Sequence, residues 1–252
     1  MNKSTITNTG LYQQPAQIYD AMMGTDLEVR IFMAVVKEIK KNIKGDKNFI
    51  LDLCCGTGIV ANMLRDLKGI KFVGVDINKN FLRLAKKKLE RNKNFSFLLG
   101  DAAHYKTNQK FNIVLLTSAY HHIENRFKSR LLKNIRKFLM KDGVLIIYEK
   151  AIPPYSNKTE FHNSNKQFYL KRIKYLKETG RNKLTPKQFN ALMNICGLSA
   201  AGEEEYKVDY NYIMNDLVQN SYKIVKKIKI WPQSNIFKNE KVGDFIFVAK
   251  KK

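Results

Sequence analysis

A short glycine turn between an apolar run and an amphipathic segment is the part of this chain best suited to bind a ligand. The apolar residues 49–51 lead into Asp52, and residues 54–58 read Cys-Cys-Gly-Thr-Gly. Apolar side chains then recur at helical spacing over 59–67, so the predicted order is strand, turn and helix. Glycine has no Cβ, which lets the backbone turn tightly and lets a ligand approach it closely.

Two further acids follow apolar runs later in the chain. Asp76 closes the run 72–75, eighteen residues after Gly58, and Asp101 follows residues 98–100. An acid at the end of the strand after a glycine turn can hydrogen-bond a ribose. The pattern therefore predicts a nucleoside-cofactor site at the carboxyl edge of a parallel sheet.

The acid before the turn distinguishes two kinds of nucleoside cofactor. Residues 56–61 also fit the G-x-G-x-x-A pattern of dinucleotide-binding turns, in which a phosphate lies over a helix N-terminus. The carboxylate of Asp52 would repel that phosphate. It would instead suit a cationic ligand, such as the α-amino group of S-adenosylmethionine.

The segments 50–58, 72–76 and 98–102 resemble, in order and spacing, the first three motifs of the class I S-adenosylmethionine-dependent methyltransferases. The resemblance implies an α/β fold with a doubly wound, Rossmann-like, seven-stranded and mostly parallel sheet, and S-adenosylmethionine as cofactor. It also implies that Asp76 holds the ribose hydroxyls and Asp101 the adenine amine. The cofactor-binding residues that we expect are Tyr19, Asp52, Cys54, Gly56, Thr57, Gly58, Asp76, Ile77, Asp101, Ala102, Thr117, Ser118 and His122. A structural turn in another α/β protein is the alternative.

The composition predicts one globular domain over 1–252. Hydrophobic residues make up 44% of the chain and charged residues 27%, and its apolar stretches are far shorter than the roughly 20 residues of a membrane span. The N-terminus lacks the apolar core of a secretory signal, and three cysteines, two of them adjacent, make no disulfide framework. We therefore expect a cytoplasmic protein.

The net charge of +24 has two explanations. A basic chain can bind nucleic acid, but here the excess is mostly Lys, whereas Arg is the preferred residue for bidentate phosphate recognition. Asn is also abundant, which favours compositional bias over a nucleic-acid footprint.

Alternating strands and helices must position these motifs. Strands are predicted at 48–54, 70–75, 95–99, 111–117 and 144–148, with helices at 58–67, 79–92 and 125–140. Beyond them we predict helices at 163–178, 185–195 and 212–229 and strands at 202–209 and 244–249. Segment 10–45 is predicted as an N-terminal helical cap, and segments 152–184 and 210–232 as helical insertions that form a lid or substrate region.

Two adjacent histidines follow the strand predicted at 111–117, at the edge where ligands bind in such sheets. His121 and His122 could each accept a proton as a general base, or merely hold the loop. The spacing of both with Glu124 is poor for a metal site, and we expect no metal. The candidate substrate contacts are Tyr12, Tyr120, Tyr155 and His162.

The methyl acceptor is the least determined feature. Amino-methylating nucleic-acid enzymes of the family carry Asn/Asp-Pro-Pro-aromatic where this chain has Thr-Ser-Ala-Tyr at 117–120. No separate RNA-binding module is evident, so we favour a small-molecule O or N acceptor. An RNA methyltransferase and a non-catalytic cofactor-binding protein of assembly or regulation are the alternatives.

Overall fold

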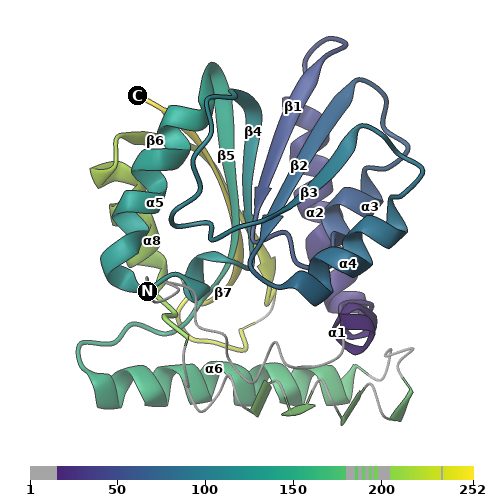
Figure 1. Cartoon of the computed structure of the whole chain (residues 1–252). Coiled ribbons are helices and arrows are strands. Elements are labelled where there is room, and N and C mark those ends of the chain that lie inside the picture. Colours follow the sequence, from purple (N-terminus) through teal and green to yellow (C-terminus); the bar gives the residue numbers. More distant parts are fainter. Residues whose placement is uncertain are drawn as a thin grey trace, which may run out of the picture.

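The computed structural model describes residues 16–179, 185–186, 189–190, 193–194, 196–197, 205–233 and 235–252. Tyr12 and part of the helix predicted at 185–195 lie outside these residues. The sheet has seven strands in the order β3-β2-β1-β4-β5-β7-β6 (Figure 1). The strands are β1 (Asn48–Leu53), β2 (Ile70–Asp76), β3 (Phe95–Leu99), β4 (Phe111–Thr117), β5 (Leu139–Ala151), β6 (Tyr222–Trp231) and β7 (Gly243–Lys251).

Five strands, β1 to β5, run parallel, and β7 lies antiparallel between β5 and β6. This confirms the predicted doubly wound, mostly parallel, Rossmann-like sheet. The buried strands are apolar on both faces, as covered parallel strands require. Along β4, Ile113 and Leu115 face one core and Val114 and Leu116 face the other.

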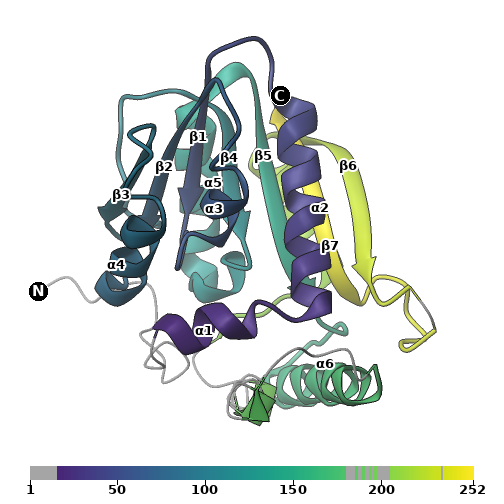
Figure 2. The ribbon, with the colours of Figure 1, turned by 90° about the vertical axis from the view of Figure 1, so that its right-hand side faces the viewer.

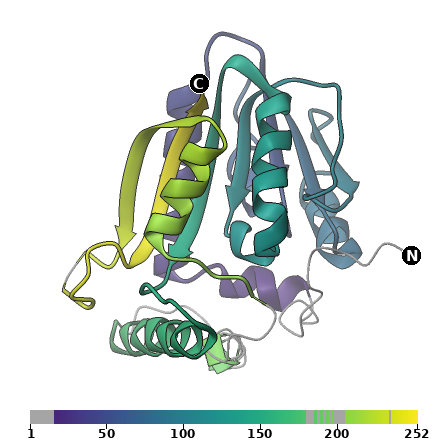
Figure 3. The same ribbon diagram turned by 90° about the vertical axis from the view of Figure 1, so that its left-hand side faces the viewer.

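Helices cover both faces of the sheet. The helices are α1 (Ala16–Met22), α2 (Asp26–Asn42), α3 (Ile59–Met63), α4 (Lys79–Lys88), the 3₁₀ turn η2 (Tyr120–His122), α5 (Asn125–Phe138), α6 (Lys158–Glu178) and α8 (Tyr210–Gln219). Figure 2 shows α2, α3 and α4 on one face, and Figure 3 shows α5 and α8 on the other. No helix among the described residues is both long and apolar enough to cross a lipid bilayer.

The N-terminal segment predicted as a cap at 10–45 divides into two helices with different positions. α2 buries Ile31, Val35 and Ile39 against the sheet, so it belongs to a core layer. Its first turn is capped by Thr25, whose hydroxyl accepts the amide of Glu28 at 3.2 Å. α1 instead lies at the carboxyl edge of the parallel strands (Figure 2).

The prediction of helical structure across 210–232 is wrong for its second half. α8 ends at Gln219, Ser221 follows with a φ of 60°, and residues 222–231 form the edge strand β6. The apolar pair Ile224 and Ile228 suggested helical spacing, but β-branched residues interleaved with lysines suit a half-buried edge strand. In the described part of the strand predicted at 202–209, residues 205–208 form no strand, and Asp209 makes an isolated parallel bridge with Ile152.

Within the insertion predicted at 152–184, α6 crosses the carboxyl edge of the sheet (Figure 1). Its inner side buries Phe168, Tyr169 and Arg172. The guanidinium of Arg172 forms ion pairs at 2.5 Å with Glu28 of α2 and at 2.5 Å with Asp244 of β7. This helix is therefore part of the core rather than a loosely attached cover. Residues 180–184 lie outside the described structure.

Candidate functional site

The glycine loop after β1 has a left-handed backbone at three positions. Cys54, Gly56 and Gly58 have φ values of 62°, 56° and 73°. A Cβ on Gly58 would lie 2.9 Å from the Cβ of Ala85 in α4, so this position requires glycine for packing as well as for conformation. The nearest neighbour of a Cβ on Gly56 would be a carbon of Phe81 at 4.0 Å. The backbone at Gly56 therefore has room for the close approach of a ligand.

The acid at the end of β2 is tied to this loop. One carboxylate oxygen of Asp76 accepts the amide of Gly56 at 2.7 Å, and the other accepts the amide of Asn78 at 2.8 Å. A carboxylate has about four lone-pair sites, so it can still accept a hydroxyl beside these amides. Burial raises the pKa of Asp76, although the backbone amides oppose that effect. The structure thus brings the first two motifs together, as predicted.

Asp52 lies in β1 as a buried carboxylate with an incomplete set of partners. It is 1% exposed, and its Oδ1 has no hydrogen-bond partner. Burial, reinforced by the charge of Asp76, raises the pKa of Asp52 well above its usual range. A buried carboxylate without a partner is costly, and a cation placed beside it would relieve that cost.

The acid after β3 organises the turn that follows. Oδ1 of Asp101 accepts the amide of Ala103 at 2.9 Å, and Oδ2 lies 3.0 Å from Nδ1 of His104. Ala102 is buried in one core of the sheet, and Ile77, after β2, is half-buried and packs against that core. These residues line the same sheet edge as the glycine loop, and their contacts with a cofactor stay predictions.

The N-terminal helix α1 closes one side of the loop. Thr57 donates its hydroxyl to Asp20 at 2.6 Å, and Lys88 of α4 donates to the backbone oxygen of Thr57 at 2.9 Å and forms an ion pair with Asp20. The ring of Tyr19 packs on Phe81 with centroids 4.8 Å apart. Asp20 and Lys88 were missed by sequence reasoning, because they look like ordinary surface charges on two unrelated helices.

The loop after β4 carries the next predicted residues. Ser118 has a φ of 53°, and its hydroxyl accepts Nζ of Lys150 at 2.8 Å. The hydroxyl of Thr117 is buried without a hydrogen-bond partner. Lys150 was missed as a site residue, although it ends the apolar part of β5.

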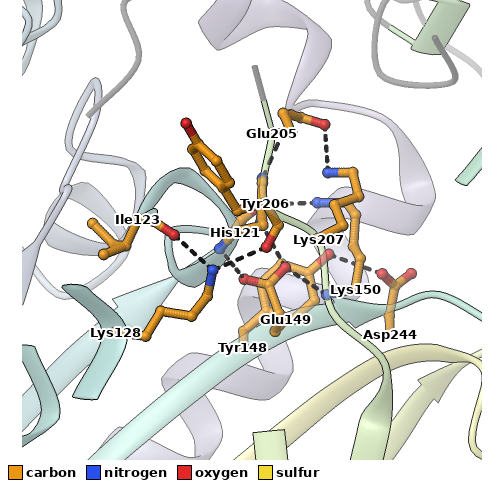
Figure 4. A network of polar contacts seen from close by, with 11 residues as sticks. His121, Ile123, Lys128, Tyr148, Glu149, Lys150, Glu205, Tyr206, Lys207 and Asp244 are labelled. Atoms are coloured by element: carbon orange, nitrogen blue, oxygen red, sulfur yellow. Dashed lines mark hydrogen bonds and ion pairs between the residues drawn. The ribbon is translucent and has the colours of Figure 1, made fainter. Parts of the chain in front are cut away.

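His121 and His122 are both buried in the turn η2, and Figure 4 shows His121 beside Glu149. Nδ1 of His121 lies 2.6 Å from Oε1 of Glu149, and the backbone amide of His121 donates to Oε2 of Glu149 at 3.0 Å. On the other side of the ring, Nε2 of His121 lies 3.7 Å from Oε1 of Glu205. Burial lowers the pKa of both histidines well below the usual value, so both imidazoles are neutral at pH 7.

Buried lysines complete this polar cluster (Figure 4). Nζ of Lys207 forms an ion pair at 2.7 Å with Oε2 of Glu205. Nζ of Lys128 donates to the backbone oxygens of Ile123 at 2.6 Å and Tyr206 at 2.9 Å, and burial lowers the pKa of Lys128 to about 7. No local pattern connects Glu149, Lys128 and Lys207 with the histidines, because these residues come from β5, α5 and the segment before α8.

The aromatic residues predicted to touch substrate are dispersed. Tyr120 is 1% exposed in the core beside α5 and α8, where its hydroxyl donates to Asp216. Tyr155 is half-buried and donates its hydroxyl to the backbone oxygen of Lys207 at 2.8 Å, which places it against the polar cluster. His162 lies on α6, packed against Phe161. Among the described candidates, Tyr155 contacts the segment that carries Lys207, and Tyr120, although it begins the turn of the histidines, directs its hydroxyl toward α8.

Comparison with known proteins finds methyltransferases that match the part of the chain carrying the cofactor motifs. A family model described as a methyltransferase domain matches residues 50–143. Over 140 residues the chain is 26% identical to an uncharacterised methyltransferase of Bacillus cytotoxicus, which covers 54% of this chain and 64% of that protein. An uncharacterised methyltransferase of Bacillus anthracis matches with the same figures. The match thus spans somewhat less than two thirds of these curated relatives.

Solved structures with the same architecture extend over nearly the whole chain. An S-adenosylmethionine-dependent methyltransferase from Clostridium acetobutylicum superposes with a TM-score of 0.61 at 14% identity, covering 95% of this chain and 98% of that one. The magnesium protoporphyrin IX methyltransferase of Synechocystis, with S-adenosylmethionine bound, gives 0.59 at 13% identity, covering 94% and 90%. At these identities the likeness concerns the fold.

The matched segment contains the glycine loop and all three acids, and it lies in a sheet of the order 3-2-1-4-5-7-6. The sequence motifs, the family model and the sheet topology all indicate the same family. The chain belongs to the class I S-adenosylmethionine-dependent methyltransferases.

Proposed function

We propose that this chain transfers the methyl group of S-adenosylmethionine to an oxygen or nitrogen of a small molecule. The main support for this cofactor is the buried carboxylate of Asp52, whose Oδ1 lacks a hydrogen-bond partner. It precedes the glycine loop, to which Asp76 is hydrogen-bonded. A cofactor with a ribose and an α-ammonium group supplies a hydroxyl for one acid and a cation for the other. A dinucleotide phosphate would face two carboxylates and be repelled.

The chain's residues would each have a defined task. Asp76 would accept the ribose hydroxyls, Asp52 would face the ammonium, and Asp101 would reach the adenine. When bound, the cofactor supplies a methyl carbon already activated by its positive sulfur. The protein has to hold the acceptor in line with that carbon and exclude water, and alignment of this kind can be worth roughly 7–11 kcal/mol.

The acceptor side would lie at His121 and His122, beside the loop after β4. Because Nδ1 of His121 is held by Glu149, the ring is fixed with the lone pair of Nε2 on its opposite side. The histidines are 3% and 7% exposed, in the region where α1 and α6 close over the sheet edge. Burial of this depth favours an acceptor small enough to be enclosed.

The high net charge favours RNA as the second candidate acceptor. The test uses the full chain with methyl-tritiated S-adenosylmethionine and a cell extract divided into a small-molecule fraction and an RNA fraction. We expect label in the small-molecule fraction, and none with an Asp76→Ala variant. Salt-sensitive label in RNA would establish the second candidate. Cofactor binding without label in either fraction would indicate a non-catalytic, assembly or regulatory role.

A further inference from the structure

We propose that His121, His122 and Glu205 bind a zinc ion beside the methyl-transfer site, with a hydroxyl-bearing acceptor as the remaining ligand. The role given to the acceptor rests on the proposed function, but the ion site itself does not. Each of the three residues offers one ligand atom, all these atoms lie within 4.8 Å of one another, and all three residues are buried. Two histidines and one glutamate are a donor set of catalytic zinc sites that leave a fourth position open.

The gap between His121 and Glu205 suits an ion better than a direct contact. Nε2 of His121 lies 3.7 Å from Oε1 of Glu205, which is too long for a hydrogen bond. Two ligands of one tetrahedral zinc, each about 2.0–2.2 Å from the metal, are about 3.4 Å apart. A lone pair on Nε2 and a carboxylate oxygen face each other across this gap, and a cation between them would turn that repulsion into attraction.

The carboxylate of Glu149 prepares His121 for this role. Its Oε1 lies 2.6 Å from Nδ1 of the ring, so Nδ1 carries the proton and Nε2 keeps a lone pair directed toward Glu205. Glu149 is itself fixed, because it also accepts the backbone amides of His121 and Lys150. A carboxylate behind a metal-binding histidine is the usual arrangement in zinc sites, where it orients the ring.

The carboxylate of Glu205 has one oxygen left for an ion. Lys207 contacts Oε2 of Glu205, so Oε1 remains for the metal. Glu149 and Glu205 are the acids beside the ring of His121, and Lys128, Lys150 and Lys207 are the basic side chains that act on it electrostatically. The ion would therefore bind beside two carboxylates and against three nearby lysines.

In the reaction, the acceptor's hydroxyl oxygen would occupy the open position, where zinc lowers the pKa of a bound hydroxyl. Its proton leaves to solvent, and the oxygen lone pair forms the new bond to the methyl carbon. The bond between carbon and sulfur breaks, and its electron pair stays on sulfur, which becomes the neutral thioether of S-adenosylhomocysteine. No oxidant or further reactant is needed.

The test measures zinc binding directly, in the absence of S-adenosylmethionine. Chelator-treated full chain is titrated with Zn²⁺ by calorimetry, and with Co²⁺ while visible absorption is recorded. We expect one ion per chain and a Co²⁺ spectrum typical of tetrahedral nitrogen and oxygen ligands. Glu205→Gln and His122→Asn should each weaken Zn²⁺ binding at least tenfold, and Glu149→Gln roughly 10–100-fold. Glu124→Gln is the matched control, since Glu124 follows the same turn but pairs with the exposed Arg126 at 2.7 Å, and should bind as the wild type does.

Absence of Zn²⁺ binding by the wild type, or equal binding by Glu205→Gln and Glu124→Gln, would overturn the site. If Glu205→Gln fails to fold, His122→Asn and the wild-type Co²⁺ spectrum decide the question instead. Methyl transfer at full rate by zinc-free protein would remove the ion from the reaction and leave the proposed function intact. Zinc binding without methyl transfer to any acceptor would support the zinc site but contradict the proposed function.

Discussion

The carboxylate of Asp76 at the end of β2 accepts the backbone amide of Gly56 at 2.7 Å. This bond joins two sequence motifs that lie on neighbouring parallel strands, and it sets the acid directly beside the loop whose backbone a cofactor must approach. The acid therefore shapes the glycine loop and would bind the ribose with its remaining lone pairs.

Replacing Asp76 by Ala should weaken binding of S-adenosylhomocysteine by roughly 1.5–3 kcal/mol, the scale for hydrogen bonds to a charged group. Isothermal calorimetry measures the change, and circular dichroism shows whether the loss of the amide bonds to Gly56 and Asn78 alters the fold. Unchanged affinity in a folded variant would refute the assignment, and tight binding of a dinucleotide by the wild type would support the rejected cofactor.

Cofactor binding should release a proton from Asp52. In the free protein, burial and the charge of Asp76 raise the pKa of Asp52, whereas a neighbouring ammonium would favour the carboxylate and lower it again. Affinity should therefore rise with pH, from the pKa of Asp52 in the complex up to its raised pKa in the free protein. Asp52→Asn keeps the shape and should weaken binding and flatten this dependence. Part of the slope should remain, since burial also raises the pKa of Asp76.

Calorimetry in buffers of different ionisation enthalpy counts the released proton. A variant that binds as the wild type does, with the same pH slope, would show that Asp52 does not face the ammonium. A large loss of thermal stability would show instead that it braces the glycine loop.

Arg172 should be essential for stability, because it is the counter-ion of two buried acids on different elements. Arg172→Met leaves Glu28 and Asp244 buried without their partner and should lower the free energy of unfolding by about 3–5 kcal/mol. Adding Glu28→Gln and Asp244→Asn removes the unpaired charges and should restore most of that loss. Urea denaturation of the single and triple variants measures both effects.

The same helix supplies the control. Lys174 and Glu178 form a pair on α6 at 3.7 Å, with side chains 76% and 62% exposed, and Lys174→Met should change stability by less than about 1 kcal/mol. Equal effects of Arg172→Met and Lys174→Met would contradict the view that α6 is anchored in the core.

The cofactor-binding part of the site could be predicted from the sequence because each of its motifs has a local sequence pattern. The turn 54–58, Asp76 and Asp101 each follow an apolar run, and parallel strands bring such positions to one edge. The carboxyl edge of the observed sheet holds all three. The strand 111–117 was likewise predicted with its observed bounds, since a continuous buried run has little ambiguity.

The acceptor half could not be predicted, because it depends on charges that meet only in the folded chain. Glu149 lies 28 residues from His121, and Arg172 lies 144 residues from Glu28, with no local pattern to connect them. The edge strand 222–231 was mistaken for helix because apolar residues four apart also fit a strand with a bulge between 224 and 226. Only the pairing with β7 decides between a helix and a strand for this segment.

The most direct measurement is a crystal structure of the full chain with S-adenosylhomocysteine bound. The account predicts the ribose hydroxyls on the carboxylate of Asp76, the ammonium facing Oδ1 of Asp52, and the sulfur directed toward the loop that carries His121 and His122. A nucleoside bound away from the carboxyl edge of β1 and β2, or an ammonium remote from Asp52, would contradict it.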